Sequence, residues 1–405
     1  MADVAGALTP PMARRAPRGV ADRVADLARL RLGTGIALIV IGLVGLFGGD
    51  WDIQWHAVIG RDRTFTPPHD LILLGIGAAG IVALASILIE SAWATRQPEL
   101  RPYGTEFLGV LHSSLGSYLV GFGAVCSAVA FPLDTYWHAL YGVDVSLWAP
   151  FHTMIYLGGI LSSFGAIYLL LSAAHLARHK SMTVTLSYAG VVVLLGMLLT
   201  KLCTFLMPSL SGHAIHLGAV TISLFPLLLA LVAVFVAVLA VRVLPWPGAA
   251  TLVVLVFVAL WLLIGALVPP AMTALVAAEH QTYLARASRL GGVVVPLLGQ
   301  TPLLLLLALA LDGVAWFGRR GAWSPTRRKQ WGLAAASLSM VVVGGLTLLL
   351  TALRVAGAAA GAGGTAGGEH GLLGFVLALV LVVPGCLVGG ALGLAIGDAL
   401  AAQRR

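Results

Sequence analysis

The chain has 405 residues, of which 59% are hydrophobic and only 10% are charged. Because a soluble domain carries about 25% charged residues, this composition excludes a soluble globular protein and predicts an all-α, polytopic helix bundle in a membrane. The formal net charge of +8 is typical of the basic loops that orient membrane proteins, so we expect the lipid bilayer and no nucleic acid as a partner. The three cysteines form no CxxC pair, which leaves zinc ribbons and redox dithiols without support.

The chain begins with a polar segment. Residues 1–31 contain six arginines, and we expect them to form a basic cytoplasmic N-terminal tail. Ten apolar stretches follow, each near the length of about 20 residues that a membrane-spanning helix needs. The stretches lie at 32–48, 69–93, 105–130, 151–176, 183–207, 213–242, 249–275, 291–317, 331–354 and 371–400. We therefore predict the tail, a membrane unit over 32–180 and an additional transmembrane bundle over 181–405.

Lys and Arg are distributed unevenly between the two alternating sets of loops. The richer set comprises the N-terminal tail, Arg96, Arg101, Arg178, Lys180, Arg242, the cluster at 319–329, Arg404 and Arg405. The poorer set comprises Arg61, Arg63, Lys201, Arg286, Arg289 and Arg354. Since cytoplasmic loops carry the excess of Lys and Arg, both termini are predicted to be cytoplasmic in what we interpret as a bacterial plasma membrane.

Most of the eleven histidines fall on the predicted outer side. They are His56, His69, His138, His152, His213, His216, His280 and His370. His112 is instead placed inside the predicted span 105–130, where we expect it to hydrogen-bond a neighbouring helix. This bias points to the outer side of the membrane as the place for chemistry.

Two of the predicted outer loops repeat one another. Both follow the pattern D-x-x-W-H-x-x-x-G-x-D, and the copies begin at Asp52 and Asp134. A proline, a second histidine and a glycine follow, the glycines being Gly75 and Gly158. The second histidine comes thirteen residues after the first in one copy and fourteen in the other. We interpret this as an internal duplication of a loop-plus-helix unit within 32–180.

Each copy carries the residue types of a metal site. The candidate ligands are Asp52, His56 and His69 in the first copy, and Asp134, His138 and His152 in the second. The aspartate and the first histidine are i and i+4, so they share a helix face. Proline suits the first turn of a helix, so the second histidine should begin the next helix and face them. A hydrogen-bonded Asp–His pair would explain one copy, but two copies favour a metal site with open positions.

At these positions the chain resembles the C subunit of the copper membrane monooxygenases, the particulate methane and ammonia monooxygenase family. One metal triad of that family is Asp-x3-His-x12-His, and the first copy matches its spacing. The other is Asn-x3-His-x13-His, and the second copy matches it with Asp134 in place of the asparagine. The resemblance covers about residues 50–160. It implies two adjacent copper sites, oxidation of an inert C–H or N–H bond, further monooxygenase-type subunits and an electron donor.

Four other residues are candidate accessory groups. Asp62 and Asp144 recur in both copies and could accept hydrogen bonds from the ligand histidines, although we favour solvated loop positions for them. His213 and His216 are three residues apart at the start of the predicted span 213–242. On a helix they would share a face and could form a ligand pair or a metal access route.

Two functions of different classes stay open. The first is a copper-dependent, monooxygenase-like oxidoreductase subunit that oxidises a small apolar substrate with O2. The second is a membrane protein for uptake, storage or delivery of a transition metal, without catalysis. Copper is the expected metal, with zinc and iron as alternatives. A purely structural metal is a third option, but closed structural sites usually use cysteine, which the triads lack.

Overall fold

The computed structural model describes most of the chain. The described residues are 19–59, 64–141, 148–177, 181–210, 214–218, 220–282, 301–342 and 372–402. Within these ranges the structure is almost entirely helical, and nine helices are long and apolar enough to cross a membrane. The prediction of an all-α, polytopic helix bundle is thereby confirmed, and the chain has the character of an integral membrane protein.

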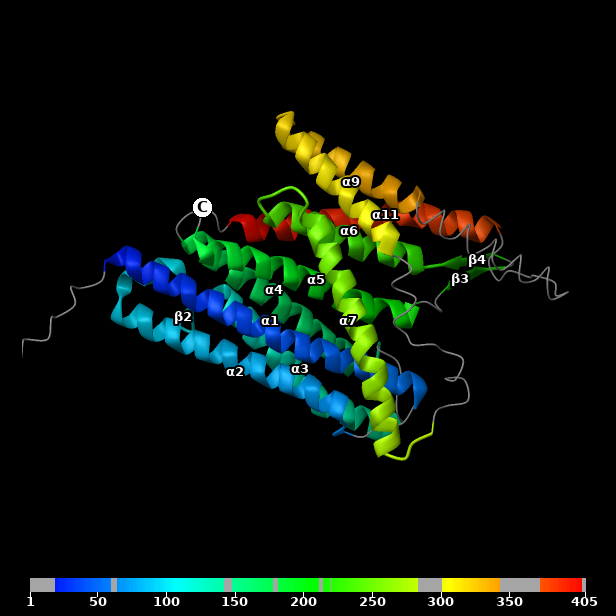
Figure 1. Cartoon of the computed structure of the whole chain (residues 1–405), viewed down its shortest axis with the longest axis horizontal. Helices are drawn as coiled ribbons and strands as arrows, with labels where there is room; N and C mark the ends of the chain where they lie inside the picture. Colours follow the sequence, from blue (N-terminus) through cyan, green and yellow to red (C-terminus); the bar gives the residue numbers. More distant parts are fainter. Residues whose placement is uncertain are drawn as a thin grey trace, which may run out of the picture.

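Long helices dominate the order of elements, with two small antiparallel hairpins between them (Figure 1). The helices are α1 Val20–Val58, α2 Pro67–Arg96, α3 Leu115–Tyr141, α4 Pro150–Leu176, α5 Met182–Leu210, α6 Phe225–Val243, α7 Ala249–Ala278, α9 Thr301–Arg320 and α11 Leu372–Ala401. The short elements are the 3-10 helix η1 Pro98–Tyr103 and the strands β1 Thr105–Phe107, β2 Leu111–Ser113, β3 Ala214–Leu217 and β4 Val220–Ser223. Residues 325–342 form a further helical stretch. Nine of the ten predicted spans coincide with candidate membrane helices, and the tenth is described only as far as residue 342.

Helix α1 starts earlier than the sequence predicted. It begins at Val20, so residues 20–31 are helical and do not belong to a tail. The reason is that Arg31 is buried and forms a two-point ion pair with Glu90 of α2. A neutralised arginine can continue a membrane helix that a free charge would end. The rest of the predicted tail, 1–18, lies outside the described residues.

Both hairpins replace the expected beginnings of spans. Residues 105–113 pair as β1 and β2, so α3 begins only at Leu115 and His112 is in a strand rather than inside a span. His112 contacts the backbone carbonyl of Arg101 through its ring nitrogen. The expected span 213–242 likewise opens with a hairpin over 214–223. Hydropathy alone could not separate these segments, because short apolar strands and helix turns have similar composition.

Helices α1 to α4 run side by side and form two repeated helix pairs, α1–α2 and α3–α4 (Figure 1). Glycine allows the backbones of each pair to approach closely. A Cβ at Gly75 would lie 3.1 Å from the Cα of Gly45, and a Cβ at Gly158 would collide with the backbone of Gly123. Gly75 and Gly158 are the glycines that close the two sequence repeats, so the repeats also encode the packing beneath the triads.

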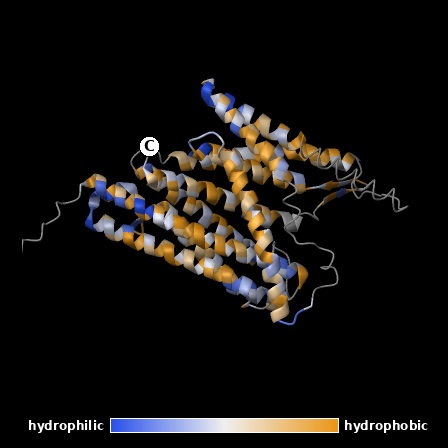
Figure 2. Cartoon of the chain, in the orientation of Figure 1, coloured by the Kyte–Doolittle hydropathy of each residue, from blue (hydrophilic) through white to orange (hydrophobic). Residues whose placement is uncertain are grey.

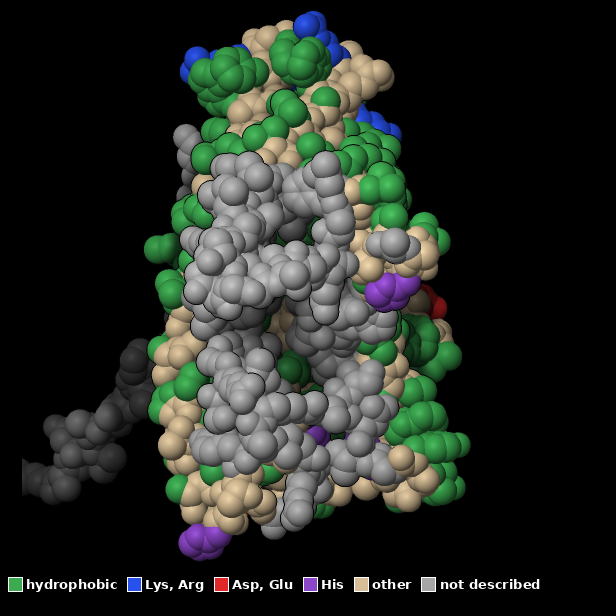
Figure 3. Space-filling view, turned by 90° about the vertical axis from the view of Figure 1, so that its right-hand side faces the viewer, with side chains coloured by type: hydrophobic (Ala, Val, Ile, Leu, Met, Phe, Trp, Pro, Cys, Tyr) green, Lys and Arg blue, Asp and Glu red, His purple; other side chains and the backbone are tan. Residues whose placement is uncertain are grey.

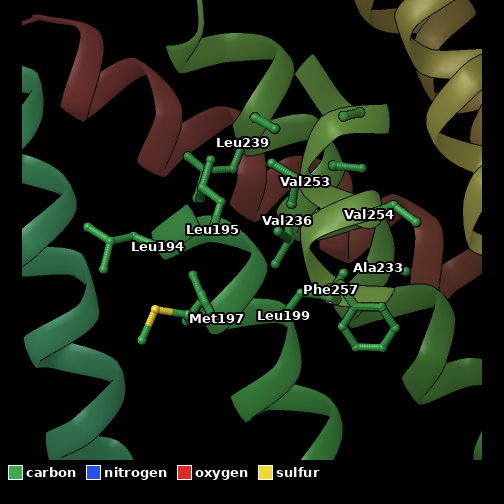
Figure 4. Packing of buried hydrophobic residues seen from close by; sticks show 14 of the residues in the cluster. Leu194, Leu195, Met197, Leu199, Ala233, Val236, Leu239, Val253, Val254 and Phe257 are labelled. Carbon is green, nitrogen blue, oxygen red and sulfur yellow. The ribbon is translucent and has the colours of Figure 1, made fainter. Parts of the chain in front are cut away.

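The larger hydrophobic cluster extends from α1 to α11, and part of it lies where α5 meets α6 and α7 (Figure 4). Leu195, Val236 and Phe257, one from each helix, are 1% exposed or less. Helix α11 packs lengthwise against α6, and α7 crosses the α1–α5 layer obliquely. Hydrophobic residues fill the middle of the helices while hydrophilic residues gather toward their ends (Figure 2). This distribution is what a bilayer-spanning bundle requires.

Candidate metal centre

The first triad forms where α1 ends and α2 begins. Asp52 and His56 lie on one face of the last two turns of α1 because the helix continues to Val58. His69 lies in the first turn of α2, which starts with two prolines. The Nε2 atom of His69 is 3.1 Å from the carboxylate oxygen Oδ1 of Asp52, and the Nε2 atom of His56 is 3.6 Å from it. The predicted return of the second histidine onto the first two residues is confirmed.

The second triad repeats this arrangement between α3 and α4. The Nε2 atoms of His152 and His138 lie 3.0 Å and 3.3 Å from Oδ2 of Asp134. Pro150 begins α4 and puts His152 in its first turn. The imidazole centroids are 5.5 Å apart here and 6.2 Å apart in the first triad. The same arrangement, the end of one helix and the first turn of the next, therefore forms both clusters.

In both clusters the ligand atoms are close enough together to hold a metal ion. In each triad one ligand atom from every residue lies within 4.8 Å of the others. Metal–nitrogen bonds of about 2.0–2.1 Å put two ligands of one ion roughly 3–4 Å apart, so a small contraction would close either set around an ion. The Oδ1 atom of Asp134 is buried and accepts no hydrogen bond from the described residues. A carboxylate in this state has capacity left for a cation.

One ring is held in the orientation that a metal ligand needs. The Nδ1 atom of His69 lies 3.2 Å from the backbone carbonyl oxygen of Thr64. If Nδ1–H donates to this carbonyl, the lone pair of Nε2 points at the triad centre, which is the usual arrangement around ligating histidines. Phe131 packs edge-on against the same ring at 5.6 Å between centroids and shields it from water.

The two triads open onto one cavity. Its volume is about 430 Å³, and its walls come from α1 to α5. Asp52, His56 and His69 line it together with Asp134 and His152. Figure 3 looks at the molecule from this end, where histidine side chains are visible and the Lys and Arg side chains in view gather at the far upper edge. The centre is thus a paired site with a common inner space.

The cavity also contains charged residues that the sequence analysis did not assign to the site. The sequence predicts Lys201 in an outer loop, but the residue lies inside α5 and lines the cavity. Its removal from the poorer loop set strengthens the charge bias used for orientation. Asp50 is 6% exposed and accepts a hydrogen bond of 3.2 Å from the hydroxyl of Thr204. A lone lysine inside an apolar span was the signal that could have revealed this.

The accessory residues are not brought to the triads where they are described. His216 lies in strand β3, so its expected place on a helix face is wrong. Its Nδ1 atom is 3.1 Å from the hydroxyl of Thr221 across the hairpin. The physical reason is that β-branched residues around it pair as strands. Asp62, Asp144 and His213 lie outside the described residues.

No family model matches this chain, and no curated protein or solved structure is significantly similar to it. The described residues form an integral membrane helix bundle with two Asp/His/His clusters that could each hold a metal ion.

Proposed function

We propose that the chain binds two transition-metal ions, copper foremost, one at each triad, and acts as a membrane monooxygenase-type subunit. The observation that carries this proposal is that two clusters of equal composition and similar geometry lie at one cavity, which five of their six residues line. Two imidazoles and one carboxylate leave coordination positions open, which a catalytic site needs and a structural site does not. The spacing match to the copper monooxygenase C subunit favours copper over zinc and iron.

The residues of the chain would have distinct tasks in such a site. The carboxylates of Asp52 and Asp134 would neutralise charge, and the four histidines would supply the remaining ligands. A bound copper ion would supply O2 activation at an open position. The Thr64 carbonyl would hold the ring of His69 in place, and Phe131 would keep water from it. As the resemblance implies, an electron donor and further subunits would complete the enzyme.

Uptake, storage or delivery of a metal is the competing function. A permease needs polar groups along the whole path, because ions at membrane depth are costly without partners. At the inner end of the cavity Leu38, Ala166 and Leu194 offer no ligand to a cation, and among the described lining residues Met197 adds a single thioether. This favours a metal that resides at the triads over one that passes through the bundle.

The first test is the metal content of the purified protein in detergent, measured by mass spectrometry. We expect about two copper ions per wild-type chain. His56→Ala and His138→Ala should each lose one, and the double variant should lose both. His216→Ala is the matched control, since this exposed histidine lies outside the triads, and it should keep both ions. Equal metal content in wild type and double variant would refute the site assignment.

A second measurement separates catalysis from storage. Copper-loaded wild type and the double variant are each mixed with a chemical reductant, and O2 consumption is followed. Faster consumption by the wild type supports the oxidoreductase proposal. If the wild type retains its copper but both proteins consume O2 at the same rate, storage or delivery of the metal is favoured instead.

A further inference from the structure

The shape of the cavity does not match a small compact substrate. Along α1 its wall extends from Leu38 to His56, which corresponds to roughly 27 Å at the helical rise of 1.5 Å per residue. Its volume of about 430 Å³ falls in the range of sites for organic ligands. A space this long and of this modest volume is narrow, and it suits a linear molecule.

The chemistry of the wall changes with depth. The outer end carries the two triads and Asp50, while Leu38, Ala166 and Leu194 line the inner end. Lys201 lies between these parts, about 10 Å outward of Leu194 along α5 at the rise of an α-helix. A ligand with one polar end and one apolar chain would find a partner for each part.

Lys201 has no anionic partner among the described residues. Its Nζ atom donates to the hydroxyl of Ser163 at 3.0 Å and to the carbonyl oxygen of Gly159 at 3.4 Å. An ammonium group has three donors, and within the described part of the chain the third meets no acceptor. Asp50 lines the same cavity but bonds to Thr204 instead. A buried cation without a counter-ion is costly, and an anionic ligand group would remove that cost.

We propose that this cavity binds a linear amphiphile with a carboxylate headgroup, such as a medium-chain fatty acid. The carboxylate accepts hydrogen bonds from Lys201, and the alkyl chain lies between α1, α4 and α5 toward Leu38 and Leu194. The apolar wall below Lys201 excludes water around the chain, and the ammonium group selects for a negative headgroup. This binding goes beyond the metal chemistry and does not require a metal.

The test is equilibrium dialysis of radiolabelled octanoate against the full-length protein in lipid nanodiscs with a metal chelator present. Protein-free nanodiscs of the same lipid give the partition of octanoate into the bilayer. We expect saturable binding to the wild type that unlabelled octanoate displaces and octan-1-ol displaces at least tenfold more weakly. In Lys201→Met, which has an unbranched side chain one atom shorter and without charge, octanoate affinity should fall at least about tenfold, as loss of a hydrogen bond to a charged group predicts.

A matched pair of glycine variants tests the location. A Cβ at Gly159 meets no atom within 4 Å, and this residue lines the cavity beside Lys201. Gly159→Leu should therefore place its side chain in the cavity and abolish octanoate binding. Gly77 on α2 is equally open but exposed and away from the cavity, so Gly77→Leu should bind as the wild type does. All variants are compared for folding by size-exclusion chromatography.

Three results would overturn the proposal. The first is wild-type binding no greater than in protein-free nanodiscs, and the second is equal displacement by octanoate and octan-1-ol. The third is unchanged octanoate affinity in folded Lys201→Met and Gly159→Leu. Because the chelator removes metal throughout, a failure here leaves the metal proposal untouched, and a chain without metal sites could still bind octanoate.

Discussion

Arg31 and Glu90 lie at one end of helices α1 and α2, and the triad of Asp52, His56 and His69 lies at the other. Both groups are largely buried and both carry ionisable side chains. At the Arg31 end the guanidinium makes four hydrogen bonds to acceptors within the chain. At the triad end ligand atoms converge on a point with a cavity beside it. A buried charge that is hydrogen-bonded and paired within the fold indicates a structural role. Ligand atoms that converge beside a cavity indicate a binding site.

Arg31 and Glu90 are hydrogen-bonded to several groups around them. The guanidinium of Arg31 donates to both carboxylate oxygens of Glu90 at 3.1 and 2.8 Å, to Ser172 and to the carbonyl of Tyr103. The backbone N–H of Ser114 also donates to Glu90. The cavity beside this network measures only 10 Å³, which is at the limit for a single water molecule. The network therefore ties α1, α2 and α4 to η1 and to the residue before α3, and it has no room for a ligand.

The largest expected effect comes from breaking this network. Arg31→Met should destabilise the protein by about 3–5 kcal/mol, because it leaves the carboxylate of Glu90 buried without its partner. Thermal unfolding in detergent measures this, and Arg29→Met at an exposed position is the control. The double variant Arg31→Met/Glu90→Gln should regain much of the loss. Equal melting temperatures for Arg31→Met and Arg29→Met would contradict the structural role of the pair.

The triad end should respond to metal rather than to mutation alone. Copper at one hundred times its Kd should stabilise the wild type by about 2.7 kcal/mol for each occupied site, since it binds the folded state. His138→Leu should lose the copper-dependent stabilisation that comes from one site. Without metal, this variant should unfold near the temperature of the metal-free wild type. Differential scanning fluorimetry with and without copper gives both values. A large loss of stability in the metal-free variant would make this end structural, like the Arg31 end.

The close contact between Gly45 of α1 and Gly75 of α2 lies between the two ends, and its loss should have an intermediate effect on stability. A side chain at Gly75 would push α2 away from the backbone of α1 at Gly45, and overpacking of this kind costs about 1–3 kcal/mol. Gly75→Leu should lower the unfolding temperature and weaken metal binding at the first triad. Gly77→Leu, two residues away in open space, should do neither. Metal loss limited to the second triad would show that this contact does not position His69.

The smallest effect is expected at the exposed ion pair between Arg242 of α6 and Asp398 of α11. Both side chains are at least half exposed, and such pairs contribute about 0–1 kcal/mol. Asp398→Asn should therefore leave the unfolding temperature in detergent nearly unchanged. A loss comparable to that of Arg31→Met would mean that this pair, too, is a structural tie.

Much of the fold could be predicted from composition and hydropathy alone. Nine of the ten expected spans became candidate membrane helices, since a bilayer admits little else for long apolar segments. The boundaries at 105–115 and 213–224 could not be predicted, because a hairpin there depends on pairing between strands. The start of α1 was also missed, since only Glu90, fifty-nine residues away, makes a buried Arg31 acceptable.

The spacing along the chain determined the triads. Asp52 and His56 share a face because an α-helix turns once in 3.6 residues, and the prolines set where the next helix begins. Only the tertiary structure decided that both triads open onto one cavity and that Lys201 lies inside it rather than in a loop. Such placement depends on five helices packing around a common space, through glycine contacts between segments far apart in sequence. Local periodicity describes one helix at a time and carries no information about which faces meet.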